Sequence, residues 1–322
     1  MDVANLSSPS KVTFCAVYLL NVSLRSESSF ETSLDTMSHV EQPLPWVDFI
    51  LVNYNGSKKI VETIDSIKQH CSSHIYSITI VDNASTDQSC RLIAEQHPDA
   101  QIIQANKNHG FGKACNIGVA QTQAPYILLI NPDARLQTNV LSIFEQFLSA
   151  YPYKPLPILG GLALDARGRP EFSFERFPNC YTLFLKALGL GRLLQSRDAY
   201  TSPTQVDHVS GSLLLIGREQ YTALGGFDEQ FFLYFEETDL QFRAREIGIM
   251  SYHIPAARYF HEAGGTFSDS SFRSQCYSNG LRTYLRKRYG KVGYLIFTAY
   301  SGLASITRPV RNTVKRLWAG KH

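Results

Sequence analysis

The sequence predicts an α/β fold organised around a parallel β-sheet. Two observations support this prediction. Between residues 47 and 130, short apolar runs of strand length alternate with segments in which apolar residues recur at helical spacing. Each apolar run also ends in a polar loop rich in Asn, Asp or Gly. Because right-handed crossovers join parallel strands, we expect all these loops at one edge of the sheet, where α/β proteins bind ligands.

The first half of the chain supplies four strands and three helices. The run at 126–130 is apolar without interruption, as expected for a strand that is buried on both faces. Ile60, Ile64 and Ile67 mark the first helix by their spacing. In chain order we expect strands at 47–52, 75–81, 102–104 and 126–130, separated by helices at 60–70, 89–97 and 114–120.

Asn131-Pro132-Asp133 follows the fourth strand and is the centre of the predicted site. Pro132 cannot donate to a sheet ladder, so Asp133 should lie just past the carboxyl end of this strand. A carboxylate there can hold a divalent metal, which in turn can hold a diphosphate. The alternative is that Asp133 caps the helix that begins near Val140.

A dinucleotide-binding enzyme would show the same alternation of strands and helices. The loop at 53–56 lacks the GxGxxG turn that binds a pyrophosphate after the first strand. Gly110 and Gly112 form a GxG, but they follow the third strand. The sequence therefore disfavours a nicotinamide or flavin enzyme.

The second half of the chain is less regular. We expect a strand at 206–216, in which Gly211 marks either the close approach of a ligand or a bulge. The segment 172–194 is aromatic and aliphatic, with scattered Arg and Lys. A strand at 252–262 and a helix at 272–287 follow.

Three acidic residues lie within four positions at the start of a predicted helix: Glu236, Glu237 and Asp239. The apolar run 231–235 would partly desolvate them, and their mutual repulsion disfavours full ionisation. Both effects raise a carboxylate pKa and favour proton acceptance near neutral pH. The alternative is that these residues only complement the dipole at the N-terminus of the helix.

Five segments of the chain carry a resemblance to a known family: Val52-Asn53-Tyr54-Asn55, 82–87, 106–118, Asn131-Pro132-Asp133 and 224–239. Together they resemble the family 2 glycosyltransferases, and more closely the bacterial rhamnosyltransferase-like branch, over about 47–289. The ordered set is specific, although each piece alone is weak. The resemblance implies a GT-A fold, in which a Rossmann-like nucleotide-sugar-binding half and an acceptor half share one mixed sheet.

The resemblance assigns the polar loops of the first half to a nucleoside-diphosphate sugar. Asn53 and Asn55 would line the base pocket, and Asp82 would contact the base or ribose. Short polar residues and Gly suit this role because a nucleoside needs donors and acceptors close to the backbone. From the residues alone, 82–87 can also form an Asx-turn with caps for the next helix. The expected donor-binding residues are Asn53, Asn55, Asp82, Asn83, Asn108, Gly110, Phe111, Asn131 and Asp133.

The resemblance also implies a metal site. Asp133 takes the place of the last Asp in the family's metal motif, whereas the first acidic position is Asn131 in this chain. The site therefore has one negative charge fewer, and we expect modest binding of Mg or Mn, completed by diphosphate oxygens and water. His261 is the second candidate ligand, although a lone His is commonly structural.

Catalytic and acceptor-binding residues are assigned in the same way. Glu237 takes the position of the family's general base, and Glu236 and Asp239 belong to the same catalytic cluster. Gly211, Ser212 and Gly226 are the expected acceptor-binding residues. From its position, 172–194 is interpreted as a lid or insertion over the acceptor. Basic residues of the helix at 272–287, among them Arg282 and Arg286, could meet a diphosphate on the acceptor.

Charge is distributed unevenly along the chain. Residues 270–322 contain eleven of the 31 Lys and Arg residues and no acidic residue, which leaves a net charge of −8 on residues 1–269. Such a basic tail favours an anionic membrane surface over nucleic acid as its partner. We therefore expect a GT-A domain at 46–289 and a basic, amphipathic, membrane-associating helical tail at 290–322. A solvated helix face and a helix packed back on the domain are the alternatives.

The N-terminal region does not fit the fold pattern. Residues 1–45 are Ser-rich and are interpreted as an extension that is disordered or precedes the true start, with Met37 as an alternative start and a weak signal peptide as another interpretation. None of the six cysteines forms a CxxC pair, which predicts neither a zinc site nor a disulfide framework. Scattered thiols and the basic tail favour a cytoplasmic protein, peripheral at the inner face of the cytoplasmic membrane.

The sequence thus predicts an inverting glycosyltransferase. The leading donor is dTDP-L-rhamnose, and the expected acceptor is a hydroxyl of a cell-surface polysaccharide precursor such as the O-antigen, free or linked to a polyprenyl diphosphate. Another nucleotide hexose and a non-catalytic nucleotide-sugar-binding member are the alternatives. A sugar-activating nucleotidyltransferase is disfavoured because 53–56 has no Gly-rich loop that bears Arg or Lys.

Overall fold

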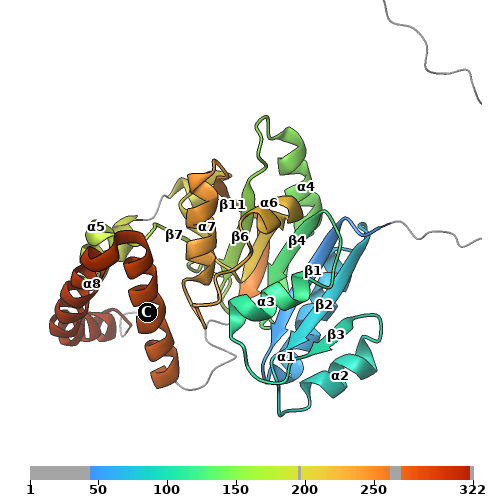
Figure 1. Ribbon diagram of the computed structural model, residues 1–322, viewed down its shortest axis with the longest axis horizontal. Helices are drawn as coiled ribbons and strands as arrows, with labels where there is room; N and C mark the ends of the chain where they lie inside the picture. Colours follow the sequence, from blue (N-terminus) through green and yellow to red (C-terminus); the bar gives the residue numbers. More distant parts are fainter. Residues whose placement is uncertain (1–43, 195–196, 262–269, 320–322) are drawn as a thin grey trace, which may run out of the picture. The chain divides into compact units, whose positions relative to one another are not determined.

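The computed structural model describes residues 44–194, 197–261 and 270–319. The predictions for residues 1–43 and for the end of a strand at Glu262 lie outside these described residues. Within them, the central feature is a nine-stranded mixed sheet with the order β3-β2-β1-β4-β10-β6-β11-β5, to which β8 adds at β11 (Figure 1). Its strands are β1 Val47–Asn53, β2 Tyr76–Asp82, β3 Gln101–Gln104, β4 Tyr126–Ile130, β5 Ala134–Leu136, β6 Ile158–Leu164, β8 Thr204–Val206, β10 Leu213–Gly217 and β11 Ser251–His261.

Helices cover both faces of the sheet, because successive strand residues point to opposite sides. In β1, Phe49 and Leu51 pack in one apolar cluster with α1 and α4, whereas Ile50 and Val52 pack in another with α3, α6 and α7. The helices are α1 Ser57–His70, α2 Ser89–Gln96, α3 Phe111–Val119, α4 Val140–Ala150, α5 Cys180–Ala187, α6 Arg218–Ala223, α7 Glu236–Glu246 and α8 Ser270–Ala319, with 3-10 turns η1 Gly191–Leu194 and η2 Asp198–Tyr200.

The parallel half of the sheet is built as the sequence predicted. β1 pairs in parallel with β2 and β4, and β2 pairs in parallel with β3. The register sets Asn53 beside Asp82, so the loops that follow these strands begin at the same edge. The four predicted strands and the three helices between them are confirmed, with shifts of a few residues at their ends.

The prediction of one strand over 206–216 is wrong. The segment forms β8, β9 His208–Val209 and β10, and Ser210-Gly211-Ser212 lies between strands. The reason is that the chain changes partners: β8 pairs with β11, β9 pairs with β7 Phe174–Glu175, and β10 pairs with β4 and β6.

The interpretation of Asp133 as a helix cap is also wrong. Asp133 is followed by β5, a short strand that the sequence pattern did not reveal, and Asn139 caps α4 by accepting a 3.1 Å hydrogen bond from Ser142 N. β5 pairs antiparallel with β11 and sets Ala134 opposite His261. The end of β11 therefore lies beside the residues that follow β4.

The helix α8 consists of two parts that meet at Gly290. Gly290 has φ 56° and ψ −132°, a conformation that breaks the helix and that residues with a side chain rarely adopt. At Gly293, a β-carbon would lie 2.0 Å from Leu285 O, so the second part turns back tightly on the first. Thr307 Oγ1 donates to Ala187 O over 2.6 Å and ties the second part to α5, beside which α8 lies in Figure 1. None of the helices in the described part of the chain is long and apolar enough to cross a bilayer.

One buried ion pair gives a stability prediction. Asp48 in β1 is 1% exposed; its Oδ2 accepts hydrogen bonds from Ala124 N and from Arg218 Nη2 at 2.7 and 2.8 Å. Removal of Arg218 leaves a buried carboxylate without its cation, so we expect Arg218→Met to lower the free energy of unfolding by about 3 kcal/mol in urea denaturation. Lys68→Met is the control, because the Lys68–Asp99 pair is exposed and should be worth less than about 1 kcal/mol. Equal losses in the two variants would contradict the prediction.

Candidate functional site

Asn53, at the end of β1, holds the first two polar loops together. It is fully buried, and its Nδ2 donates to Asp82 Oδ1, Ser85 Oγ and Ser89 Oγ over 2.8, 3.0 and 2.8 Å. Its Oδ1 accepts from Gly56 N over 3.1 Å. Asp82 Oδ2 in turn accepts from Ser85 N over 3.0 Å. In this structure both side chains bond within the protein and act as supports for the loops.

Asn55 and Asn83 support neighbouring loops in the same way. Asn55 is left-handed, with φ 54°, and its Oδ1 accepts from Thr86 N over 2.8 Å. Asn83 Nδ2 donates to Gly110 O over 2.9 Å. The Asx-turn interpretation of 82–87 is confirmed for Asp87, whose Oδ1 accepts from Ser89 N over 3.1 Å.

A small pocket opens at this edge of the sheet, with a volume of about 90 Å³. Five of the predicted donor-binding residues line it: Asn83, Asn108, Gly110, Phe111 and Asn131. The other lining residues are Val52, Tyr54, Pro132, Phe232 and Leu233, which the sequence reasoning did not assign to the donor. Tyr54 could have been found because it lies between two predicted residues, whereas the approach of Phe232 from far along the chain carries no local signal.

Gly110 brings the loop before α3 against the backbone of Phe232. Gly110 has φ 81°, and a β-carbon there would lie 2.1 Å from Phe232 O. The adjacent Phe111 N donates to the same carbonyl over 2.9 Å. Only glycine permits this approach, because any side chain would overlap the carbonyl.

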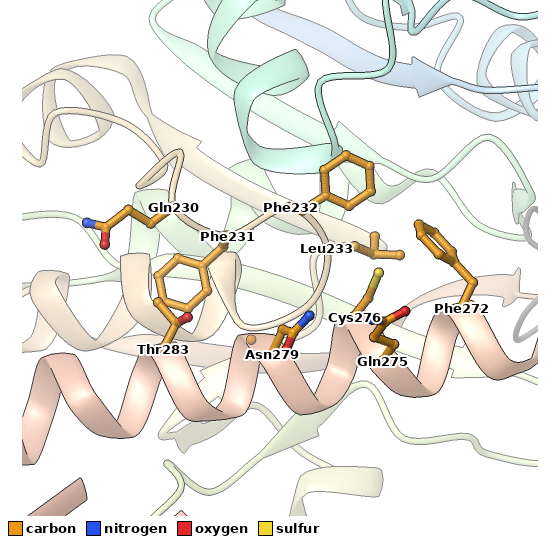
Figure 2. Close-up of a pocket in the computed structure, with 10 residues that line it drawn as sticks. Gln230, Phe231, Phe232, Leu233, Phe272, Gln275, Cys276, Asn279 and Thr283 are labelled. Atoms are coloured by element: carbon orange, nitrogen blue, oxygen red, sulfur yellow. The ribbon is translucent and has the colours of Figure 1, made fainter. Parts of the chain in front are cut away.

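The loop 230–233 also borders a second cavity, of about 390 Å³, on the side of α8 (Figure 2). In Figure 2, Leu233 lies opposite Phe272 and Cys276, which project from α8. Phe232 and Leu233 line both this cavity and the small pocket. The loop therefore forms a thin wall between the two.

Asp133 and His261 lie together at the ends of β4 and β11. Asp133 Oδ1 is 3.6 Å from His261 Nε2, and Asn131 Nδ2 is 3.3 Å from the same nitrogen. The β5–β11 pairing produces this approach across 128 residues of sequence. Among the described residues, no group of three or more His, Cys, Asp or Glu could hold a metal; those that meet here are this carboxylate, this imidazole and the Asn131 amide. Such a donor set fits a metal whose remaining ligands are diphosphate oxygens and water.

The segment Ser210-Gly211-Ser212 lies between the acidic helix α7 and the sheet edge that carries the predicted donor-binding loops. Ser212 O accepts from Asn131 N over 3.2 Å, and Ser212 Oγ hydrogen-bonds to Tyr259 OH over 2.6 Å. A β-carbon on Gly211 would lie 3.4 Å from Phe111 Cε1 and 3.6 Å from Glu237 Cβ. Gly211 therefore lies close to both Phe111, which lines the small pocket, and Glu237, the predicted base.

Glu236 and Glu237 begin α7 after a strained turn. Tyr234 and Phe235 both have positive φ, 70° and 73°, which is unfavourable for aromatic residues and is typical of functional sites. Burial raises the pKa of Glu236 well above its usual range, and the neighbouring Glu237 raises it further. Burial also raises the pKa of Glu237 to about 7, despite opposing hydrogen bonds from backbone N–H groups. The Oε2 of each lies buried without a hydrogen-bond partner among the described residues.

Asp239 differs from the two glutamates because two cationic side chains pair with its carboxylate. It is fully buried; Arg243 Nε donates to its Oδ2 over 2.8 Å, and Lys287 Nζ lies 2.8 Å from its Oδ1. Its carboxylate thereby joins α7 to α8. Of the three predicted catalytic residues, Asp239 is the least available to a substrate.

Glu237 lines a pocket of about 200 Å³ with aromatic walls. Phe172, Phe174, Tyr234 and Tyr277 belong to these walls, so the predicted insertion 172–194 does border this site. Glu175 and His208 lie in the same lining, and burial lowers the pKa of His208 to about 4, so its ring is neutral near pH 7. Sequence reasoning missed both, because they reach the pocket only through the β7–β9 pairing.

Gly226 is not brought to this pocket. It has φ 69°, and a β-carbon there would lie 2.6 Å from Asn116 Oδ1. Its carbonyl accepts from Arg243 Nη2 over 2.9 Å. Its place in the structure is a tight turn that packs α3 against α7, and nothing in its surroundings indicates contact with an acceptor.

Comparison with known proteins agrees with this geometry. Residues 48–154 match the family described as Glycosyl transferase family 2. The chain is 25% identical over 234 residues to an N-acetylglucosaminyl-diphospho-decaprenol L-rhamnosyltransferase of Mycobacterium tuberculosis, covering 66% of this chain and 75% of that protein. It is also 25% identical over 244 residues to rhamnosyltransferase WbbL of Escherichia coli, covering 72% of this chain and 88% of that protein.

Solved structures are similar in fold. The mannosyltransferase PcManGT of Pyrobaculum calidifontis, in complex with GDP-Man and Mn²⁺, aligns with a TM-score of 0.52 at 16% identity, over 85% of this chain and 81% of that one. GalNAc-T7 with UDP, GalNAc and Mn²⁺ aligns with a TM-score of 0.54 at 14% identity, over 75% of this chain but only 48% of that one. The chain is a glycosyltransferase with the GT-A fold. Within that class, residues 48–154 match family 2, and the chain is similar to the rhamnosyltransferases named above.

The contact between Gly110 and Phe232 gives a second prediction. Gly110→Ala places a β-carbon against Phe232 O, so we expect a loss of stability beyond the cost of a left-handed alanine, about 1–2 kcal/mol, together with weaker binding of a nucleotide sugar. Gly248→Ala is the matched control, because Gly248 has φ 85° and a β-carbon there meets nothing within 4 Å. Urea denaturation and a ligand-induced thermal shift measure the two effects. Equal effects of both substitutions would show that the contact with Phe232 has no special importance.

Proposed function

We propose that this enzyme transfers a hexose, with L-rhamnose from dTDP-rhamnose as the leading donor, to a hydroxyl group of a cell-surface glycan precursor, with inversion at the anomeric carbon. The position of Gly211 carries the proposal. Phe111 of the small pocket and Glu237 both lie within 4 Å of the position that a β-carbon on Gly211 would take, so a donor and an acceptor could meet beside Gly211. The names of the relatives, two of which are rhamnosyltransferases, support the choice of sugar.

The small pocket is the proposed entry for the nucleoside. Its volume of about 90 Å³ is small beside the roughly 300–1,000 Å³ of typical ligand pockets, so it would hold only one end of the donor. The rest would extend along the sheet edge past Asn131 toward Asp133. The supporting residues Asn53, Asn55 and Asp82 would fix the loops, whereas Asn108, Phe111 and Asn131 line the pocket and would face the ligand.

A divalent cation is the proposed cofactor, with Mn or Mg held by Asp133 and His261. When bound, such a cation neutralises negative charge on the diphosphate leaving group. The imidazole ligand suits Mn better than Mg, which prefers oxygen ligands. Asn131, in the place of an acidic residue, leaves the site with a smaller negative charge and predicts moderate affinity.

Glu237 is the proposed general base. The acceptor hydroxyl loses its proton to Glu237 as its oxygen forms a bond to the anomeric carbon, and the bond from that carbon to the diphosphate oxygen breaks. The nucleoside diphosphate leaves, so bonds and charge balance without another reactant. A carboxylate with a pKa of about 7 suits this task, since it is ionised yet basic near neutral pH. The aromatic walls around it would hold the sugar ring of the acceptor.

The acceptor is proposed to be linked to a polyprenyl diphosphate at the cytoplasmic face of the membrane. The name of the Mycobacterium tuberculosis relative specifies a diphospho-decaprenol acceptor. The second part of α8 supports membrane contact, because Val292, Leu295 and Ile306 are 59%, 66% and 76% exposed and recur on one face of the helix. Residues 270–319 carry ten Lys or Arg and no acidic residue, which suits an anionic leaflet.

Donor binding can be tested by thermal shift against a panel of dTDP-, UDP- and GDP-sugars, each with and without Mn²⁺. One donor should raise the melting temperature by roughly 5 °C at 100 times its dissociation constant, because it binds only the folded state. Asp133→Asn should abolish the metal-dependent part of the shift, whereas Glu237→Gln should retain the shift and lower kcat by about 100- to 10,000-fold.

Asp165→Asn serves as the control for the loss of a carboxylate, since Asp165 lies in an exposed turn and accepts from Arg167 N. It should leave the donor-induced shift unchanged. If no nucleotide sugar shifts the melting temperature of the folded wild-type protein, the proposal that the loops of the first half bind a nucleotide sugar is wrong. A shift without transfer to any acceptor would indicate a non-catalytic binding protein.

The pH dependence of transfer gives a further prediction. Because the base must be deprotonated, kcat/KM should fall about tenfold per unit as pH drops below about 7 and should level off above it. Glu175 raises the pKa of Glu237, so Glu175→Gln should move this limb to lower pH. Glu62→Gln on α1, a carboxylate paired with Arg135 outside the pocket, should leave it in place. If Glu175→Gln does not shift the pH at which kcat/KM begins to fall, a group other than Glu237 causes the fall.

A further inference from the structure

A cavity of about 620 Å³, open to solvent, lies between the two parts of α8, and the proposed transfer reaction leaves it unassigned. Each part contributes residues at helical spacing, so each presents one face to the cavity. The first part contributes Arg273, Ser274, Tyr277 and Ser278, and the second contributes Ser301 and Ser305. The lining is therefore rich in hydroxyl groups, and among the described residues it contains one cation and no carboxylate.

Arg273 gives this cavity its chemical character. Its Nε is buried and has no hydrogen-bond partner in the described part of the chain. A buried guanidinium N–H without an acceptor is costly, and an anion in the cavity would satisfy it. Guanidinium groups bind phosphate oxygens through two parallel N–H donors, and neighbouring hydroxyls can add further hydrogen bonds. The cavity thus has the composition of a phosphate site.

The structure separates Arg273 from the basic residues that the sequence analysis emphasised. Arg282 lies nine residues further along α8, which is half a turn out of phase, and is exposed. Its Nη2 donates to Asn279 Oδ1 over 3.1 Å. Arg286 is also exposed, and neither residue lines the cavity. Only the tertiary arrangement of α8 distinguishes Arg273 from them.

The cavity adjoins the pocket of Glu237. Tyr234 and Tyr277 line both, so the two spaces share a wall of two aromatic side chains. The influence of Glu237 on the pKa of Tyr277, which it helps to raise, agrees with this proximity. A molecule with a hydroxyl group at Glu237 and an anionic group a few atoms away could occupy both spaces.

We propose that the cavity between the two parts of α8 binds the phosphoryl groups of the acceptor, as a diphosphate that joins its sugar to a lipid; this inference rests on the proposed function. A phospholipid headgroup offers the same phosphate chemistry. The wall shared with the Glu237 pocket favours the acceptor, because a phospholipid has no sugar to place beside the base.

Direct binding of two probes tests the assignment: N-acetylglucosamine linked to farnesol through a diphosphate, and the same sugar linked through an ether. Both are titrated into the full chain carrying Glu237→Gln, which prevents turnover, with donor present. We expect the diphosphate probe to bind at least about tenfold more tightly, the effect of one or two charge-assisted hydrogen bonds. Arg273→Gln should remove this preference and leave binding of the ether probe within about twofold, whereas Arg282→Gln should retain the preference.

Several outcomes would overturn the assignment. Equal affinity of both probes, or an Arg273→Gln variant that retains the preference, would remove the phosphate site and leave the glycosyltransferase function intact. Binding of neither probe, together with a normal donor-induced thermal shift, would reject a lipid-diphosphate acceptor and with it this site. Flotation with phosphatidylglycerol vesicles tests whether the cavity binds a phospholipid headgroup instead. If Arg273→Gln weakens vesicle binding and leaves the preference for the diphosphate probe unchanged, the cavity binds a headgroup and the acceptor assignment is wrong. Unchanged melting temperature of Arg273→Gln confirms that the variant is folded.

Discussion

The antiparallel pairing of β10 with β4 is the contact on which the arrangement of the site depends. Leu213 pairs with Ile130, so the segment before β10 must pass beside the segment after β4. Ser212 O therefore receives the N–H of Asn131, and Gly211 comes to lie between Phe111 and Glu237. A nucleotide-binding half alone would be an ordinary parallel sheet. This one pairing sets its carboxyl edge beside Glu237, the proposed base.

The acidic start of α7 shows how position decides the character of a carboxylate. Asp239 meets Arg243 and Lys287 and is a structural anion, whereas the Oε2 atoms of Glu236 and Glu237, just before it in the helix, lie buried without a hydrogen-bond partner in the described part of the chain. Their raised pKa values follow from that difference. The left-handed turn at Tyr234 and Phe235 sets the direction in which α7 begins. Gly280 of α8 leaves room for this turn, because a β-carbon on Gly280 would lie 2.6 Å from Tyr234 O. The helix α8 thus packs against the strained turn that precedes Glu237, the proposed base.

Much of the sheet edge with the predicted donor-binding loops could be predicted, because the sequence patterns that mark it are local. Strand ends are marked by the change from apolar to polar residues, and parallel crossovers bring such ends together wherever they occur. Which side chains remain exposed to a ligand is a different question. Asn53 and Asn131 look alike in sequence, yet Asn53 bonds three neighbours inside the protein and Asn131 lines the pocket. The hydrogen-bond partners of an amide come from other loops, and no local pattern encodes them.

The sequence by itself determined the α/β class, the strands and helices of the parallel first half, the resemblance to family 2 glycosyltransferases, and the acidic and Asn-Pro-Asp motifs. Each of these depends on residues close together in the chain. Only the tertiary structure decided that 206–216 breaks into three strands, that Asp133 meets His261, and that Phe232, Glu175, His208 and Arg273 border the pockets. These facts depend on strand pairing and on the turn of α8 at Gly290. In both, segments far apart in the chain compete for the same hydrogen-bond and packing partners. Such competition is settled by packing of the whole molecule, which local periodicity does not describe.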